Sequence, residues 1–475
     1  MKSVVPHTRG MGKARLNVGS CYAVGLAIVA LGLTATPAAA QDAPATPPAG
    51  PDTPAAQPAP AAAPADTTLP AHTDDSGSTT DILSKNTLSL LLDARFAVAN
   101  GERSFTNGGL GKTRFQGTAN GDYKAYAVPV EADLVWEPRF TGSLSANVSA
   151  AWQRDQENKV DLIEAFVNFL PKQTGKLGFS ARAGLMWPEI SLEHSTGGAW
   201  SVVNTITPSA INAWVGEETK VVGVEGTLHA SLGQHEVALT GGVFGFNDTS
   251  GTLLSFRGWA LHDEKATGFG HFPLPPLNNF IKLLQQNETR STIEIDHQPG
   301  FYARLDWRPP WPFGIALFYY DNRGDPQAFR LTGQWGWRTR FWNLGINADL
   351  GASTKLLAQG MTGSTIMGFE EHGVPWVHTY FRSAYVLVTR QMTEKLALTG
   401  RVEAFGTREH GSEMSPLESE DGWSTTAAVR YGLTRNLTAF VEALNVRSTR
   451  GTRADIGLAP FQAQTVFQAS LRFRL

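Results

Sequence analysis

The feature that most constrains this chain is an alternation of apolar and polar side chains that recurs from residue 87 to the C-terminus. Residues 143–152 (SLSANVSAAW), 301–308 (FYARLDWR) and 396–406 each place apolar side chains on one face and polar side chains on the other. Successive side chains of a β-strand point to opposite faces, so this period of two predicts amphipathic strands. The 48 glycines and the aromatic content of 10% also fit a β-protein better than a helical bundle.

Two folds are built from such strands. In a soluble sandwich the apolar face is the core, whereas in an outer-membrane barrel it meets lipid and the polar face lines a wet lumen. Strand length favours the barrel, because many segments run 10–14 residues and most soluble strands have about 5–6. Connection length favours it too, since tight turns such as 392–395 alternate with long polar connections such as 248–296.

Aromatic spacing gives a third argument for the barrel. In 124–137 the alternation places Tyr126 and Trp136 on one face. At the tilt of a barrel strand they would lie roughly 23 Å apart along the membrane normal, close to the apolar band of about 25 Å. Pro129 lies between them and predicts a β-bulge.

We therefore expect an all-β fold, a transmembrane antiparallel β-barrel of about 16–18 strands over residues 87–475. Residues 327–339 are interpreted as one of these strands, and 252–262 and 354–366 are possible additions. A barrel of this size can hold an aqueous channel.

The first 86 residues are expected to stay outside the barrel. Residues 1–40 fit a secretory signal peptide, with four basic residues, an apolar run over 21–33 and an Ala-Ala-Ala ending. Cleavage would remove Cys21, the only cysteine, so neither disulfides nor a thiol nucleophile is expected. Residues 41–86 are rich in Pro and Ala and predict a disordered periplasmic tail, which is either a passive spacer or a tether.

Several functions are disfavoured by composition and motif content. The chain has 40 Lys and Arg against 43 Asp and Glu, a balance that argues against nucleic-acid binding. Its sequence contains no His-Glu-x-x-His, no Cys-His set and no calcium loop, so no metal or other cofactor is expected. His194 beside Ser195 is a faint hint of lipid hydrolysis, and we predict that the protein is not an enzyme.

If the polar faces line a lumen, their charged side chains are candidates for the solute path. The predicted pore-lining residues are Arg304, Arg308, Arg382, Arg401, Glu403, Arg430, Glu442, Arg472 and Arg474. They form either a basic wall that favours anions, with glutamates opposite, or cross-strand ion pairs that fill the wall. The connection 188–218 is unusually apolar. It either folds into the lumen as a constriction loop that ends near Glu217 and Glu218, or packs on the rim or at a subunit contact.

Three stretches resemble outer-membrane porins, most nearly the phosphate-selective porin O and P family. They are VDLIEAFVNFLP (160–171), RAGLMWPEISLEH (182–194) and GEETKVVGVEGTL (216–228). The last strand, which alternates up to Leu475, is similar to the assembly signal of outer-membrane proteins. The resemblance implies a porin of a Gram-negative outer membrane, in contact with lipid, through which small hydrophilic solutes diffuse. It leaves open whether the solutes are anionic and whether the barrel is a homotrimer. The alternative is a structural or anchoring barrel with a blocked lumen.

Overall fold

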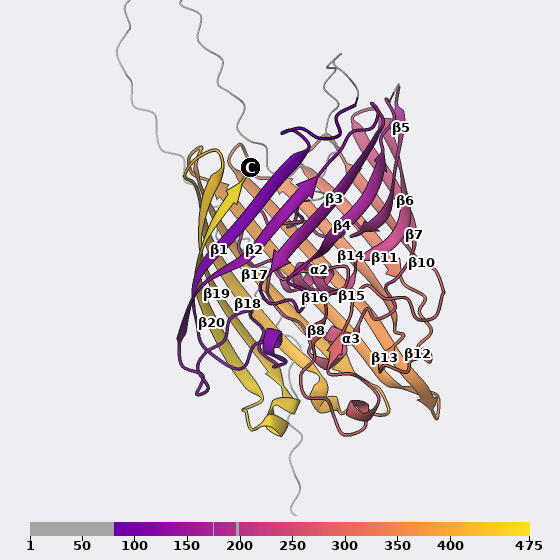
Figure 1. Cartoon of the computed structure of the whole chain (residues 1–475), viewed down its shortest axis with the longest axis vertical. Helices are drawn as coiled ribbons and strands as arrows, with labels where there is room; N and C mark the ends of the chain where they lie inside the picture. Colours follow the sequence, from indigo (N-terminus) through magenta and orange to yellow (C-terminus); the bar gives the residue numbers. More distant parts are fainter. Residues whose placement is uncertain (1–79, 174, 196–198) are drawn as a thin grey trace, which may run out of the picture. The chain divides into compact units, whose positions relative to one another are not determined.

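The computed structural model describes residues 80–475 except 174 and 196–198. The predicted signal peptide and most of the predicted tail, residues 1–79, lie outside this range. Sixteen strands of the described part close into one antiparallel barrel (Figure 1). Its first eight strands are β1 (Leu88–Ala99), β2 (Lys124–Trp136), β3 (Leu144–Gln153), β4 (Val160–Phe169), β5 (Leu177–Met186), β6 (Val221–Leu232), β7 (His235–Gly245) and β10 (Gly300–Arg308). The other eight are β11 (Phe313–Asp321), β14 (Arg338–Asp349), β15 (Thr354–Glu371), β16 (Val374–Gln391), β17 (Leu396–Glu409), β18 (Glu420–Gly432), β19 (Leu437–Arg450) and β20 (Phe461–Arg474).

The connections hold the remaining elements. They are the helices α2 (Ala210–Glu218) and α3 (Thr252–Phe256), the 3-10 turns η2 (Phe105–Asn107), η3 (Ile281–Leu283), η4 (Pro416–Glu418) and η5 (Gly451–Ile456), and two small sheets that pair β8 (Phe272–Pro273) with β9 (Glu288–Thr289) and β12 (Phe329–Arg330) with β13 (Gln334–Trp335). Within the described residues, no helix is long and apolar enough to cross a membrane.

The barrel closes where the first strand meets the last. β1 pairs with β2 on one side and with β20 on the other, so that Phe96 lies opposite Ala469. Each barrel strand therefore has two neighbours and the sheet has no free edge, which a lipid-exposed sheet requires. The predicted all-β barrel is confirmed, at the lower end of the predicted strand number.

The two ends of the barrel differ in their connections. Residues 233–234, 309–312 and 433–436 form tight turns at one end, whereas 187–220 and 246–299 are long connections at the other. The described chain enters β1 and leaves β20 at the end with the tight turns. Short periplasmic turns and long outer loops are typical of outer-membrane barrels, so we call the long-loop end the outer end.

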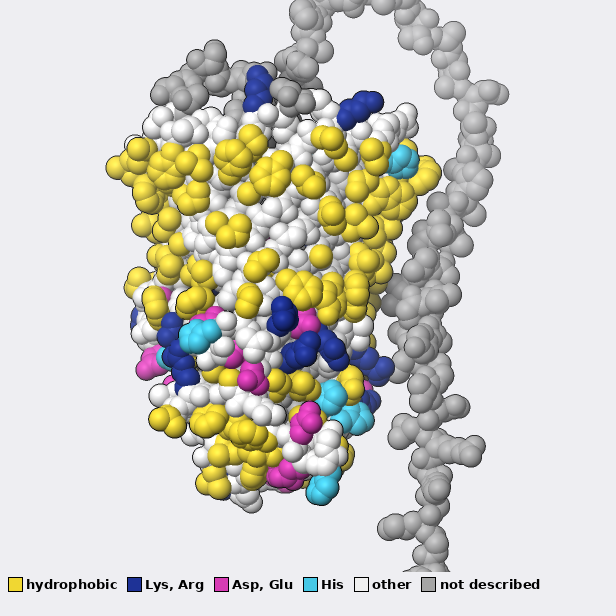
Figure 2. Space-filling model, turned by 90° about the vertical axis from the view of Figure 1, so that its right-hand side faces the viewer, with side chains coloured by type: hydrophobic (Ala, Val, Ile, Leu, Met, Phe, Trp, Pro, Cys, Tyr) yellow, Lys and Arg dark blue, Asp and Glu magenta, His cyan; other side chains and the backbone are white. Residues whose placement is uncertain are grey.

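The outside of the barrel is apolar. Val224 and Leu228 of β6 and Leu239 and Val243 of β7 are each more than half exposed. On the face of the barrel that Figure 2 draws, hydrophobic side chains cover most of the wall, and most charged groups and His gather nearer one end. Such a surface is stable against hydrocarbon, so the chain is a transmembrane barrel of the bacterial outer membrane.

The predicted bulge is confirmed, but it changes the face of half of β2. The register with β1 shifts after the pair Asp93–Glu131, and Ala94 lies opposite Pro129, so Val130 is the extra residue. The extra residue reverses the alternation, because each inserted residue moves the following side chains to the other face. Trp136 faces outward, whereas the Tyr126 ring packs against Phe115 inside the barrel. The expectation that Tyr126 and Trp136 share a face was wrong.

Two of the expected strands were also wrong. Residues 327–339 do not form a barrel strand: they contain the short β12 and β13, and the positive φ of Gly333 (79°) lies between them. Residues 252–262 begin with α3 instead of a strand. The possible addition 354–366 is real and belongs to β15.

A pair of adjacent glycines tests the packing of the wall. Gly242 faces the lumen, where an added Cβ would lie 2.2 Å from Cζ of Tyr302, whereas a Cβ at outward-facing Gly241 meets nothing within 4 Å. We predict that Gly242→Ala lowers the free energy of unfolding by about 1–3 kcal/mol, because the buried Tyr302 ring must shift. Gly241→Ala should stay within about 0.5 kcal/mol of wild type. Urea unfolding of the refolded barrel in detergent measures both; equal effects would contradict the packing described.

Candidate functional site in the barrel lumen

The described part of the connection between β5 and β6 lies inside the barrel. Residues 210–218 form α2, and all nine of its residues are buried. The helix begins after Ser209, whose hydroxyl accepts a hydrogen bond from the backbone N–H of Asn212, a common N-cap. Because the closed sheet surrounds α2, the helix occupies space that water would fill in an open pore (Figure 1). We call residues 187–220 the inserted loop.

Four charged side chains anchor the inserted loop to the opposite wall. Arg401 of β17 contacts both Glu193 of the loop (2.9 Å) and Glu403 (3.1 Å). Glu403 accepts a hydrogen bond from the N–H of Ala210 at 2.7 Å. We call Glu193, Arg401, Glu403 and Glu442 the anchor cluster, and all four are buried.

Glu442 of β19 holds the preceding turn of the loop. Its carboxylate accepts hydrogen bonds from the backbone N–H groups of Ile206 (2.6 Å) and Thr207 (3.2 Å), and from the Gln468 amide (2.9 Å). A buried carboxylate needs such partners, because leaving a charge unpaired away from water costs several kcal/mol. The wall and the loop therefore satisfy each other.

A second connection, residues 246–299, closes over the first. Arg257 forms two hydrogen bonds of 2.6 Å to Glu217 of α2, and His262 Nε2 lies 2.9 Å from the same carboxylate. From a third connection, Lys112 donates to the carbonyl of Arg257 and pairs with Glu420 of β18 at 2.5 Å. Three connections from the outer end are thus tied to each other and to the wall.

The pKa values of the two neighbouring glutamates of α2 are shifted in opposite directions. Burial disfavours the charged form of Glu217, but Arg257 and His262 outweigh it and lower the pKa of Glu217 to about 2. Burial raises the pKa of Glu218 to about 7, although hydrogen bonds from Leu253 N–H and the Trp214 indole favour its charged form. The Glu217–Arg257 pair is therefore an ion pair over the whole physiological range.

One half of the lumen is an apolar core. Inward-facing aromatic side chains of β7, β10, β11, β14 and β16 pack against the loops. Trp214 of α2 lies 5.3 Å from the rings of both Phe341 and Phe381 and 6.1 Å from Trp259. Packing of this kind excludes water, so a solute path along this half would require the loops to move.

The other half is polar and contains two small cavities. Both are lined by Asp263, and each has about 10 Å³ open to water, the room of about one water molecule. Together they are bordered by four basic side chains, Arg95, Arg114, Lys265 and Arg472, and three acidic ones, Asp93, Glu131 and Asp263. Within the described residues, Oε1 of Gln468 and Nδ1 of His262, which border the first cavity, have no hydrogen-bond partner. Buried polar atoms are normally paired with protein or water, so water or a solute fits there.

Most of the predicted pore-lining residues face the lumen. Those that do are Arg304, Arg308, Arg401, Glu403, Arg430, Glu442, Arg472 and Arg474. Arg472 binds Asp93 (2.9 Å) and the carbonyl of Val202, and Arg474 donates to the Ser201 hydroxyl. Six of the eight contact the inserted loop, so they do not form a bare basic wall: Arg304, Arg401, Glu403, Glu442, Arg472 and Arg474. The predicted constriction residues Glu217 and Glu218 lie at the end of the helix in the lumen.

Arg382 is the exception and its predicted place in the pore was wrong. It shares the exposed face of β16 with Val386 and Val388, whereas Tyr385 and Leu387 are buried on the lumen side. The physical reason is the strict alternation of this regular strand, in which the even-numbered residues from 380 to 390 all point outward.

Sequence reasoning missed part of the site. Asp93 and Arg95 of β1 were visible as polar residues at alternate positions of a candidate strand. Arg95 pairs with Asp93 at 2.8 Å and with Asp263 of the second connection. Glu193, Asp263 and Lys265 lie in connections without a periodic pattern, so no signal marked them.

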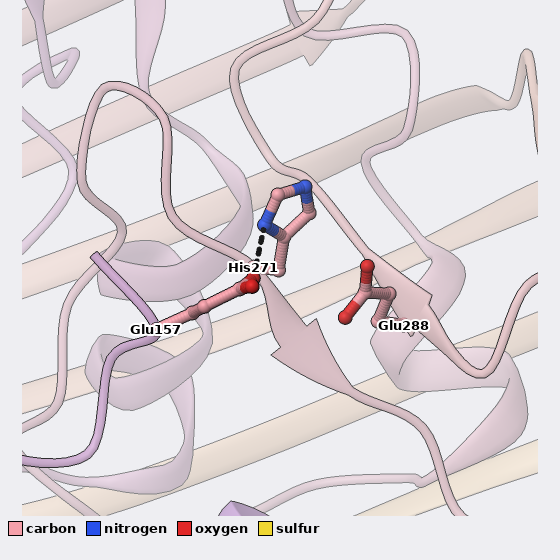
Figure 3. A group of neighbouring side chains, drawn as sticks. All are labelled: Glu157, His271 and Glu288. Carbon is pink, nitrogen blue, oxygen red and sulfur yellow. Dashed lines mark ion pairs between the residues drawn. The ribbon is translucent and has the colours of Figure 1, made fainter.

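Two groups among the described residues have ligand atoms close enough together to hold a cation. They are Glu157, His271 and Glu288 (Figure 3), and Asp248, Glu294 and Asp296. In the first group His271 Nδ1 lies 3.3 Å from Glu157, whose side chain is 70% exposed. In the second, the carboxylates of Asp248 and Glu294 accept backbone hydrogen bonds from Ile295 and Phe246, which account for their positions. No residue of either group borders the two cavities.

His194, next to Ser195, makes structural contacts. Its Nδ1 lies 2.8 Å from the Ser191 hydroxyl, and its ring stacks on Trp200 with the centroids 3.7 Å apart. The Ser195 hydroxyl is directed to the carbonyl of Ser201 instead. The hydroxyl that contacts His194 is therefore that of Ser191 and not that of Ser195, the residue on which the hint of lipid hydrolysis rested.

Comparison with known proteins places the fold. No protein-family profile and no curated protein sequence matches the chain. Among solved structures, the outer membrane channel DcaP of Acinetobacter baumannii matches 82% of this chain and 99% of its own, with 9% identity and a TM-score of 0.50. The chain has the fold of outer-membrane porins. An anion-selective porin from Comamonas acidovorans (9% identity, 82% and 99% covered, TM-score 0.46) and OprB of Pseudomonas putida (11%, 82% and 94%, 0.45) are also similar.

The acidity of Glu217 gives a pH-dependent prediction for this barrel. A carboxyl whose pKa is lowered on folding contributes stability above its unfolded pKa of about 4.5, and loses it as the pH falls through the folded value of about 2. We predict that wild type loses about 3 kcal/mol of unfolding free energy between about pH 5 and pH 2 that Glu217→Gln does not lose.

The neighbouring residue supplies the control. Glu218 is already protonated in the folded protein below its pKa of about 7, so Glu218→Gln should lose at least as much unfolding free energy on acidification as wild type does. Urea titrations of the refolded proteins in detergent at the two pH values give these differences. A Glu217→Gln variant that is as acid-sensitive as wild type would contradict the role of the Arg257 pair.

Proposed function

We propose that this protein is a passive outer-membrane channel of the porin type for small hydrophilic solutes and ions. The observation that carries the proposal is the pair of cavities in the polar half of the lumen, which both border Asp263 between the inserted loop and the wall formed by β1, β2, β19 and β20. A route along this half keeps a permeating ion next to charged and amide groups.

The size of the cavities implies that the inserted loop controls passage. Only about one water molecule fits in each cavity, so a larger solute requires displacement of the loop. On the polar side the loop is held by hydrogen bonds and ion pairs, for example Glu442 to the N–H of Ile206. Water can replace such contacts at a small net cost, whereas the aromatic packing around Trp214 has no replacement in water.

Weak anion preference is the selectivity we propose. The cavities are bordered by four basic and three acidic side chains, and the three arginines among them are paired: Arg95 with Asp93, Arg114 with Asp155, and Arg472 with Asp93. Guanidinium groups that are paired with carboxylates produce only a weak positive electrostatic potential. The resemblance of 160–171, 182–194 and 216–228 to phosphate-selective porins supports a channel, but a ladder of free basic residues for phosphate is not part of the proposal. Association as a homotrimer stays a prediction.

The alternative is a structural barrel with a blocked lumen. It is favoured by the same aromatic core, because Trp214, Trp259 and their partners fill half of the interior, and by the complete burial of α2. The two functions differ in one measurable property. Ions cross a channel, at least when the inserted loop is loosened, whereas they do not cross a blocked structural barrel.

Planar-bilayer recording of the refolded barrel distinguishes them. We predict small current steps for wild type and larger steps for Glu442→Gln, because the neutral side chain binds the N–H groups of Ile206 and Thr207 more weakly and loosens the loop. Val441→Ala, the adjacent outward-facing position, should match wild type. In a salt gradient the reversal potential should favour anions slightly.

The outcomes are separable. Steps that appear only in Glu442→Gln would still support a channel that the inserted loop closes. Folded wild type and folded Glu442→Gln that both give no steps would favour the blocked structural barrel.

A further inference from the structure

Arginine side chains cover one part of the outer surface of the barrel. Arg338 and Arg340 of β14, Arg382 of β16 and Arg408 of β17 are all exposed and occupy outward-facing positions. We call these four residues the outer basic patch. By contrast, the outward positions of β6 are occupied by Val222, Val224, Gly226 and Leu228, and they carry no charge.

The strand register brings these arginines together. Arg340 is paired with Ser364 on the next strand, Ser364 with Tyr380, and Tyr380 with Arg408. Arg340 and Arg408 therefore lie in one row across β14 to β17, with Ser364 and Tyr380 between them. Arg382 lies two positions from Tyr380 on the same face, in the row of Trp342 and Thr362. With neighbouring strands about 4.8 Å apart, the guanidinium groups can reach a common ligand.

Two members of the patch have acidic partners and two do not. Arg408 makes hydrogen bonds of 2.9 and 2.7 Å to Asp421, and Arg338 lies 3.3 Å from Asp321. For Arg340 and Arg382 the described part of the chain supplies neither a hydrogen bond nor an ion pair to the side chain. The patch therefore presents two unpaired guanidinium groups and a net positive charge.

The patch borders the apolar surface at its outer margin. Trp342 and Leu344 follow Arg340 on the outward face of β14, and Ala384 and Val386 follow Arg382 on β16. Figure 2 shows Lys and Arg side chains directly beside the hydrophobic band, on the side of the charged end. Since aromatic and basic residues gather at the headgroup level of a membrane, these arginines lie beside lipid headgroups and not in bulk water.

We propose that the outer basic patch binds the phosphate groups of anionic glycolipids in the outer leaflet. Guanidinium groups bind phosphate with two parallel hydrogen bonds and keep their charge at any relevant pH. Arg340 and Arg382 are the primary contacts, and the Tyr380 hydroxyl, between Arg340 and Arg408 in the row, is a further donor. Basic side chains at a membrane surface attract anionic lipid, and the apolar belt beside the patch accommodates the acyl chains.

The test compares the double variant Arg340→Gln/Arg382→Gln with wild type. Refolded barrel in neutral detergent is titrated with a bis-phosphorylated glucosamine lipid, with the same lipid after removal of its phosphates, and with inorganic phosphate. Binding is followed by native mass spectrometry. Wild type should bind the phosphorylated lipid at least about tenfold more tightly than the dephosphorylated lipid, and the double variant should lose about tenfold in affinity for it.

Arg390→Gln is the matched control. Arg390 is also an exposed, outward-facing arginine of β16, but it lies at the tight-turn end, opposite Thr354 and Leu398. This variant should bind the phosphorylated lipid like wild type. All variants change exposed side chains, and circular dichroism with heat-dependent gel mobility shows that each is folded.

Four results would overturn the proposal. The double variant could bind the phosphorylated lipid as tightly as wild type, or Arg390→Gln could weaken binding equally, which would indicate attraction by total charge alone. Inorganic phosphate that displaces the lipid at equal concentration would show a free-anion site instead of a lipid site. A folded channel that conducts as proposed above but binds no phosphorylated lipid would leave the function intact and refute only the patch.

Discussion

The backbone pairing of β1 with β20 leaves the sheet without a free edge, and the other features of the molecule depend on it. Hydrocarbon offers no hydrogen-bond partner to a strand edge, so a sheet in lipid must close on itself. Closure sorts the side chains: at each position one face meets lipid and the other meets the lumen. Asp93 and Arg472, opposite each other in this pairing, both face inward and bind each other.

A closed sheet of sixteen strands creates an interior that must be either hydrated or filled. Here the connections of the outer end fill it, and the charged side chains of the wall hold these connections in place. Arg401, Glu403 and Glu442 would be costly if buried alone, and the inserted loop supplies Glu193 and the N–H groups of Ile206 and Ala210 as partners. Charges that resemble a pore lining in the sequence thus become anchors in the fold.

The sequence predicts the regular part of this molecule well and the irregular part poorly. Strands such as 301–308 and 463–475 alternate without interruption, and their lumen and lipid faces follow directly. A single extra residue, Val130, reverses the faces of Tyr126 and Trp136, and the pattern of β2 does not show on which side of Pro129 the extra residue falls. The alternation of β16 places Arg382 on the outward face, whereas the sequence analysis counted it among the charged side chains of the lumen face. Glu193 and Asp263 depend on loop paths that have no period to read.

The two halves of the lumen differ in the free energy needed to move the inserted loop away from the wall. Around Trp214 the loop is held by ring contacts with Phe341 and Phe381, and separating them would expose large apolar surfaces to water. Along β1 and β20 it is held by ion pairs and hydrogen bonds, which water can replace one at a time. In the proposed channel, a solute would therefore have a lower barrier along the polar half than along the aromatic half. On this proposal, passage would depend on how strongly the anchor cluster holds the loop rather than on the width of the sixteen-stranded wall.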